Sequence, residues 1–138
     1  MPQQPIELIL FRQMASYLDT PAFLIGPDGE LLYFNDAAES QLGTTFTEVD
    51  ELPLDEWLAT FRPIDEHGAS LAPDAVPLVV ALRQSRAVHE RIVFIDRRGE
   101  RHAILVTAFP LRGQNGRTLG AVAFFWPDEA SGIAGDVS

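Results

Sequence analysis

Apolar residues recur at helical spacing near the start of the chain. One stripe, with residues three or four positions apart as on one helix face, consists of Leu8, Phe11, Met14, Ala15 and Leu18. Ile9, Leu10 and Tyr17 widen the apolar surface well beyond that stripe. The pattern predicts an amphipathic helix within residues 1–20 that contacts its own domain on one side. Its other side is then available to a second copy of the chain or to another domain.

From residue 22 the spacing changes to that of strands. Residues 22–25 and 31–34 are short apolar runs on either side of Pro27-Asp28-Gly29, where glycine after aspartate supplies the positive φ of a tight turn. Asp36 and Glu39 have the spacing of a helix N-cap and its N3 carboxylate. Gly43 stands where a left-handed C-cap residue is expected. A hairpin followed by one short helix is therefore predicted.

The middle of the chain has the character of helices that cover a sheet. Residues 45–61 predict one or two short helices interrupted near Pro53, and a loop follows through residue 73. Asp74 has the position of an N-cap for a helix from Ala75 to about Gln84. Pro77 is tolerated in its first turn, where backbone N–H groups have no helical partner.

The remaining pattern predicts an antiparallel meander of three longer strands. These strands span residues 88–96, 101–111 and 119–126, with turns at residues 97–99 and at Gln114-Asn115-Gly116. In the last two strands both alternating sets of residues are apolar, whereas a sheet with one solvated face alternates apolar with polar. We therefore expect an α+β fold: a five-stranded antiparallel sheet, within residues 21–127, with short helices on one face and the N-terminal helix on the other. Residues 128–138 are small and polar, and a disordered tail is expected there.

Composition and charge narrow the classes of partner. The formal net charge is −10, every one of the ten basic residues is arginine, and cysteine is absent. An acidic chain is a poor partner for a nucleic-acid backbone or an anionic membrane surface, because both are bound by neutralising negative charge. Without cysteine there is no disulfide, thiolate metal ligand or cysteine nucleophile. No apolar segment approaches the roughly 20 residues that span a bilayer, so a soluble cytoplasmic protein is expected.

The charge is unevenly spread along the chain. Residues 1–82 carry a net charge of −12 and residues 83–112 a net charge of +4. Such an asymmetry can orient a head-to-tail or antiparallel contact between copies. The alternative is that both regions are simply solvated faces.

Several motifs resemble the PAS (Per-ARNT-Sim) family. The run from Pro27-Asp28-Gly29 through Asn35-Asp36-Ala37-Ala38-Glu39 to Leu42-Gly43 resembles the family's opening turn, strand, asparagine and alanine-rich helix. Asp96-Arg97-Arg98-Gly99 and Asn115-Gly116 resemble its last two hairpins. The resemblance covers about residues 14–128 and implies a bacterial sensory module, which in this family binds haem, flavin, a small metabolite or nothing. The last strand departs from the family, since Pro127 follows Trp126 where a signature leading into a downstream helix is common.

The resemblance places a ligand pocket between the sheet and the helices. The lining expected from it consists of Phe23, Ile25, Phe34, Phe46, Trp57, Phe61, Val79, Val80, Phe94, Leu105, Thr107 and Phe125. Such a lining suits an apolar ligand with few polar anchors, such as a fatty acid or an aromatic acid, with Arg91 or Arg62 binding its carboxylate. An ordinary close-packed core explains the same residues equally well.

Other chemistry has little support in the sequence. Haem would need an axial histidine on the helix within residues 75–84, which contains none, and flavin photochemistry would need a cysteine. Adjacent Asp65, Glu66 and His67 rarely point at one ion, so a solvated loop is expected there and no metal site. Ser70 beside His67 and Asp65 has no nucleophile elbow. Asn35 is expected to bond local backbone before the helix.

Two functional hypotheses remain, neither of them catalytic, because no nucleophile, base and orienting group occur together. The first is a signalling module that homodimerises and acts on a separate partner, which the family resemblance implies to be a protein such as a histidine kinase or regulatory phosphatase. Its dimer contacts are expected from the N-terminal helix and an exposed sheet face, through Leu8, Phe11, Met14, Ala15, Leu18, Val122 and Phe124. The second is a small-molecule sensor with its ligand in the pocket, and a haem or flavin sensor is a remote alternative.

Overall fold

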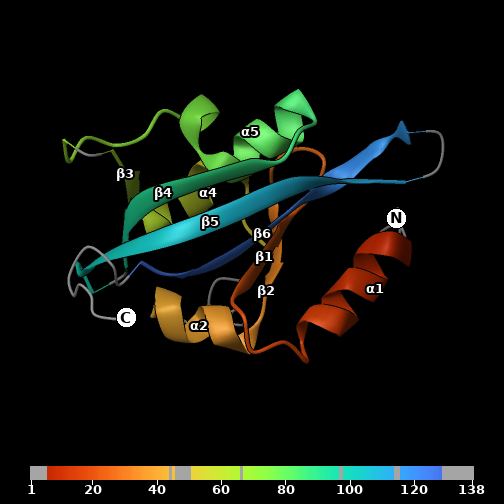
Figure 1. The fold of residues 1–138 in the computed structure, drawn as a ribbon, viewed down its shortest axis with the longest axis horizontal. Coiled ribbons are helices and arrows are strands. Elements are labelled where there is room, and N and C mark those ends of the chain that lie inside the picture. Colours follow the sequence, from red (N-terminus) through yellow and green to blue (C-terminus); the bar gives the residue numbers. More distant parts are fainter. Residues whose placement is uncertain are drawn as a thin grey trace.

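A computed structural model describes residues 6–43, 45, 51–65, 67–96, 98–113 and 116–128. The elements form one curled antiparallel sheet with helices against it (Figure 1), in the strand order β2-β1-β6-β5-β4-β3. The strands are β1 (Ala22–Ile25), β2 (Leu31–Phe34), β3 (Pro63–Ile64), β4 (Val88–Ile95), β5 (Arg101–Arg112) and β6 (Thr118–Pro127). The helices are α1 (Ile6–Ala15), α2 (Asp36–Leu42), α4 (Leu54–Phe61), the 3₁₀ turn η1 (Pro73–Ala75) and α5 (Pro77–Gln84).

The predicted hairpin and meander are confirmed, but the sheet has six strands rather than five. The additional strand, β3, contains only two residues, and it pairs with Val93 and Phe94 of β4. Pro63 begins it, and proline is confined to sheet edges because it has no N–H to donate to a neighbouring strand. A strand this short, begun by proline, gives no alternating pattern, so the sequence did not predict it.

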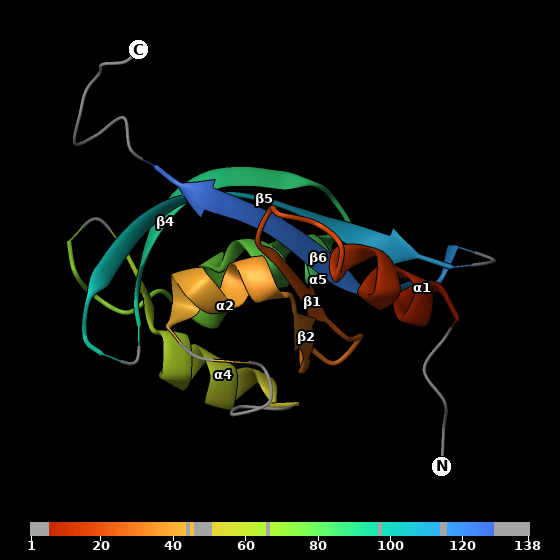
Figure 2. The same ribbon diagram turned by 90° about the horizontal axis from the view of Figure 1, so that it is seen from below.

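The two faces of the sheet carry separate apolar cores. One core joins α2, α4 and α5 to Phe23, Ile25, Val106 and Phe125 of the strands. The other joins α1 to Ala22, Leu24, Leu32 and Val122. Figures 1 and 2 show α5 on one side of the strands and α1 on the other. The expectation that the central strands are covered on both faces is confirmed.

Both predicted helix N-caps are displaced from their expected residues, whereas Gly43 is the left-handed C-cap of α2, as predicted. The N-cap of α2 is Asn35, whose side chain accepts a hydrogen bond from the N–H of Ala38, and Asp36 is the first residue of the helix. Helix α5 begins at Pro77 and not at residue 75, since a residue before proline is held extended, as Val76 is. Asp74 lies in η1 and does not cap α5.

Some predictions concern residues that the structure does not describe. Phe46 and the tail at residues 129–138 lie outside the described residues. Among the residues that are described, no helix is long and apolar enough to span a bilayer.

Candidate functional site

A small apolar cavity lies between the sheet and helices α4 and α5. Its volume is about 80 Å³, well below the roughly 300–1,000 Å³ of typical ligand pockets. Trp57 fixes one wall, because its indole N–H donates to the Gly29 carbonyl at 2.8 Å and its ring packs edge-on against Phe23 at 5.4 Å. The residues lining the cavity are Phe23, Leu42, Trp57, Phe61, Pro63, Val76, Pro77, Leu78, Ile92, Phe94, Ile104, Val106, Ala123 and Phe125.

On the opposite face of the sheet, α1 has two apolar sides. Leu8, Phe11 and Ala15 are buried against the strands. The ring of Phe11 packs edge-on against Phe124 at 6.2 Å. The other side of the helix and the turn after it expose large apolar side chains to solvent: Ile6 (65%), Ile9 (42%), Leu10 (56%), Met14 (51%) and Tyr17 (87%). Among the described residues the only other large apolar side chain with comparable exposure is Trp126.

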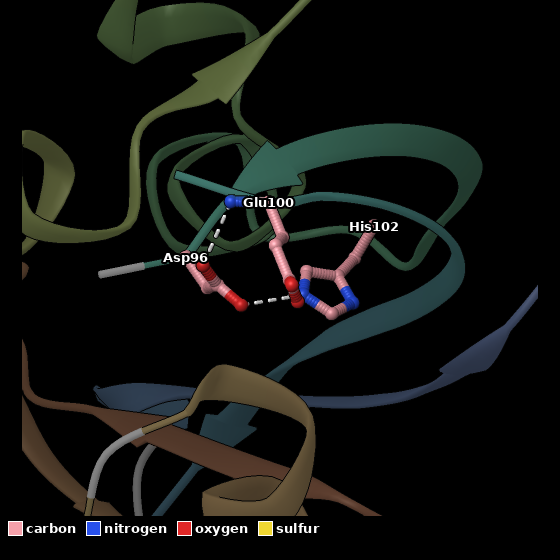
Figure 3. A group of neighbouring side chains, drawn as sticks. All are labelled: Asp96, Glu100 and His102. Carbon is pink, nitrogen blue, oxygen red and sulfur yellow. Dashed lines mark hydrogen bonds and ion pairs between the residues drawn. The ribbon is translucent and has the colours of Figure 1, made fainter. Parts of the chain in front are cut away.

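A polar cluster closes the turn between β4 and β5 (Figure 3). His102 donates to the buried Asp96 carboxylate at 2.7 Å, and the backbone N–H groups of Arg98 and Glu100 bond its other oxygen at 2.8 and 3.0 Å. The His102 ring also stacks on Phe94, with 4.9 Å between ring centres. Mainly because of the His102 hydrogen bond, the pKa of Asp96 is lowered to about 2.

The side chains of this cluster lie as close together as metal ligands do, but their hydrogen bonds are those of a group that stabilises the turn. Ligand atoms of Asp96, Glu100 and His102 lie within 4.8 Å of one another. However, both oxygens of Asp96 already accept hydrogen bonds, and the guanidinium of Arg98 lies 3.5 Å from one of them and 3.8 Å from Glu100. This cluster was not predicted from the sequence. The signal available there was an aspartate three residues before the turn glycine of a predicted hairpin.

Comparison with known proteins identifies the family. The family model described as PAS domain matches residues 19–128. The chain belongs to the PAS domain family. No curated protein matches the chain.

Solved structures of other PAS domains share the fold at low sequence identity. A PAS domain from a two-component sensor histidine kinase is 14% identical, with a TM-score of 0.60, and the match covers 89% of this chain and 97% of that one. The PAS domain of nitrogen regulation protein NR(II) from Vibrio parahaemolyticus is 18% identical, with a TM-score of 0.61 and coverage of 86% and 98%. The light-state dimer of the fungal blue-light photoreceptor Vivid is 14% identical, with a TM-score of 0.63 and coverage of 91% and 97%.

Five residues expected to line the pocket of this PAS domain do line the cavity: Phe23, Trp57, Phe61, Phe94 and Phe125. Another three, Ile25, Phe34 and Val79, are buried in the same core but are not on the cavity wall. Val80 belongs to the same core and also borders an open groove outside β4.

The prediction is wrong for Leu105 and Thr107. In β5 the cavity is lined by Ile104 and Val106, so the alternate residues point to the opposite face of the sheet. Thr107 pairs there with Phe124, which packs against the α1 core. Both alternating sets of β5 are largely apolar, and an error of one residue transfers a strand's whole set to the other face.

The two arginines proposed as carboxylate anchors do not face the cavity. Arg62 is the left-handed C-cap of α4, with a φ of 38°, and its side chain is exposed. The guanidinium of Arg91 donates to Asp128 at the end of β6. Neither arginine lines the cavity, so neither is placed to bind the carboxylate of a ligand held there.

Four of the predicted dimer contacts are buried within the chain. Leu8, Phe11, Ala15 and Val122 are 8% exposed or less, because they form the α1 core. Phe124 and Leu18 are half-buried, and Phe124 packs against the same core. Of the predicted dimer contacts, only Met14 lies on the exposed side of α1. The residue stripe was assigned to the wrong side of the helix, because both sides are apolar.

The size of the cavity also bears on the cofactors known in the family. Haem and flavin are both much larger than about 80 Å³ can hold. Helix α5, Pro77–Gln84, carries no histidine to ligate haem iron, and the chain has no cysteine to form a flavin adduct. The residues of this cavity therefore do not fit either group.

Asp65 and Asn35 have structural roles. One carboxylate oxygen of Asp65 accepts hydrogen bonds from the backbone N–H groups of His67 and Ala69, at 2.8 and 3.0 Å. These bonds lower the pKa of Asp65 and hold the loop after β3. Asn35 accepts a hydrogen bond from the N–H of Ala38 in the first turn of α2, as the sequence predicted, and it also accepts one from the N–H of Ala22 at the start of β1.

Proposed function

We propose that this PAS domain is a sensory and signalling module, not an enzyme, which forms a homodimer through α1. The dimer passes a conformational change to a separate signalling protein, such as a histidine kinase or a regulatory phosphatase. The observation that carries the proposal is the apolar outer side of α1 and of the turn after it, formed by Ile6, Ile9, Leu10, Met14 and Tyr17. We call this surface the α1 outer stripe.

A second copy of the chain is the occupant that the α1 outer stripe suits best. An exposed apolar cluster of this kind is unusual on a monomer and marks an interaction surface. Two copies of one helix stripe are self-complementary, as a twofold interface requires. The structural likeness to a kinase PAS domain and to a light-state dimer supports the proposal at the level of the fold.

The size of the expected dimer contribution follows from two side chains. Leu10 and Met14 are about half exposed, and fully burying such a side chain is worth about 2 kcal/mol. Burying the exposed half of both residues in both copies is then worth about 4 kcal/mol, or about a thousandfold in the dimer dissociation constant.

The test is the Leu10→Glu/Met14→Glu double variant, studied by size-exclusion chromatography with light scattering. The wild type should be a dimer at tens of micromolar, and the double variant a monomer with an unchanged circular dichroism spectrum. Ser40→Glu, at an exposed polar position of α2 and outside the α1 outer stripe, is the matched control and should remain dimeric. A monomeric wild type, or a dimeric double variant, would contradict the proposal.

A second candidate function is the sensing of a small apolar molecule in the cavity. Its apolar aromatic lining and its volume of about 80 Å³ suit a ligand smaller than benzene, since benzene binds in an apolar cavity of roughly 150 Å³. A fatty acid or an aromatic acid requires the cavity to expand. Native mass spectrometry of the purified protein separates the candidates: bound mass beyond the polypeptide favours the sensor, and a bare dimer mass favours the interaction module.

A further inference from the structure

One edge of the sheet is open along most of a long strand. β3 lies beside one end of β4 (Figure 1), and on that strand it pairs only with Val93 and Phe94. Among the described residues, no strand pairs with positions 88–92 of β4 on that side. An open strand edge offers backbone donors and acceptors to any extended chain that reaches it.

The register shows which backbone groups face that edge. The N–H of Ile95 donates to the carbonyl of Arg62, on the β3 side of the strand. Backbone groups of alternate residues point to the same side, so those of Arg91 and His89 also point towards the open edge. Two residues thus present their N–H and carbonyl groups to an incoming strand.

An open groove runs along this edge. Its volume is about 620 Å³, and apolar side chains of Ile64, Leu71, Val80 and Ile92 form part of its lining. It lies within the size range of ligand-binding clefts, and its lining shares only Ile92 with that of the apolar cavity between the sheet and helices α4 and α5.

The charged side chains of the groove indicate which charge the partner should carry. Glu90 is exposed, and it points to the same side of the sheet as the apolar Val88 and Ile92 on either side of it. The other acids are Asp65, which caps its own loop, and Asp74, which pairs with Arg83. The groove's bases are also engaged, because Arg91 bonds Asp128 and Arg86 bonds Gln84.

A second copy of the chain is a poor occupant of this edge. If two copies pair antiparallel through positions 88–92, centred on position 90, then Glu90 lies opposite Glu90. Like charges directly opposite are destabilising. A basic residue at that position makes the favourable pair.

We propose that the open edge of β4 is a binding site for an extended peptide segment of another protein, which adds as an antiparallel strand. The segment carries the pattern apolar, any residue, basic, any residue, apolar. Its apolar side chains face Ile92 and Val88, and its basic side chain faces Glu90. Backbone hydrogen bonds to Arg91 and His89 provide affinity, and the alternate side chains provide specificity.

The experiment titrates a synthetic Val-Thr-Lys-Thr-Val peptide, with blocked ends, into the isotope-labelled full chain. The amide signals of His89 and Arg91 should shift most and gain protection from hydrogen exchange. A Val-Thr-Glu-Thr-Val peptide should bind about tenfold more weakly, since an attractive cross-strand pair becomes a repulsive one. Val-Pro-Lys-Pro-Val, which lacks the two N–H groups that would bond β4, should not bind.

A charge reversal in the protein makes the test independent of the peptide's own properties. Glu90→Lys should reverse the preference, so that the glutamate peptide binds more tightly than the lysine peptide. Glu56→Lys, an equal charge change at an exposed position of α4 outside the groove, should keep the original preference. The proposal is overturned if millimolar peptide leaves the β4 amides unshifted. It is also overturned if proline is tolerated, or if Glu90→Lys binds both charged peptides alike.

Discussion

Asn35 links three elements of the fold through four hydrogen bonds. Its side-chain oxygen accepts from the N–H groups of Ala22 and Ala38, both at 3.0 Å. Its side-chain nitrogen donates to the carbonyls of Ala15 at 2.9 Å and Thr20 at 3.0 Å. The side chain is 1% exposed, so water cannot replace these bonds. One residue therefore joins the end of α1, the start of β1 and the first turn of α2.

Replacing Asn35 with alanine should cost about 4 kcal/mol. A net contribution of about 1 kcal/mol for each of four hydrogen bonds gives this value. It is a large share of the roughly 5–15 kcal/mol by which a typical domain is stable. Urea unfolding at fixed protein concentration, followed by tryptophan fluorescence, measures it. The slope with denaturant should stay unchanged while the midpoint falls.

Asn35→Asp distinguishes this role from simple helix capping. Aspartate and asparagine are equally good N-caps, but aspartate cannot donate to Ala15 and Thr20, and its charge would face their carbonyls. We therefore expect Asn35→Asp to be nearly as destabilised as Asn35→Ala. Ser40→Ala, at an exposed position of α2, should cost less than about 0.5 kcal/mol. A near-native stability for Asn35→Asp would refute the reasoning, since the side chain of Asn35 would then contribute only as a helix N-cap.

Two further predictions concern the tie at the β4–β5 turn and the cavity wall. The pKa of Asp96 falls from 3.8 to about 2 on folding, so its ionised form contributes stability above about pH 4, and that contribution is lost as the pH falls towards 2. The free energy of unfolding should therefore fall less steeply between pH 4 and pH 2 in Asp96→Asn than in the wild type. Identical slopes in the two proteins would contradict this role of Asp96. Trp57→Phe removes the hydrogen bond to the Gly29 carbonyl and should cost about 1–3 kcal/mol in urea unfolding, with no loss of the α1-mediated dimer. A Trp57→Phe variant as stable as the wild type would show that this hydrogen bond does not stabilise the cavity wall.

The sequence by itself determined the elements and their order, because the signals for them are local. The pair Asp28-Gly29 predicts the turn of the first hairpin, and the pair Asn115-Gly116 in the sequence predicts that of the last one. The change from helical spacing to alternation separates α1 from β1. The asparagine before α2 was recognised as a residue that bonds local backbone, although the cap was assigned one position too late.

Only the tertiary structure decided which side of each element faces which neighbour. In β5, Leu105 and Val106 are both apolar, so alternation does not tell which set faces the cavity. In α1, Leu8 and Leu10 are equally apolar, yet the first is buried and the second is exposed. Periodicity identifies a face only where its opposite is polar. Where both sides are apolar, packing against the rest of the chain makes the choice. The same packing creates the cavity, the α1 outer stripe and the open edge of β4.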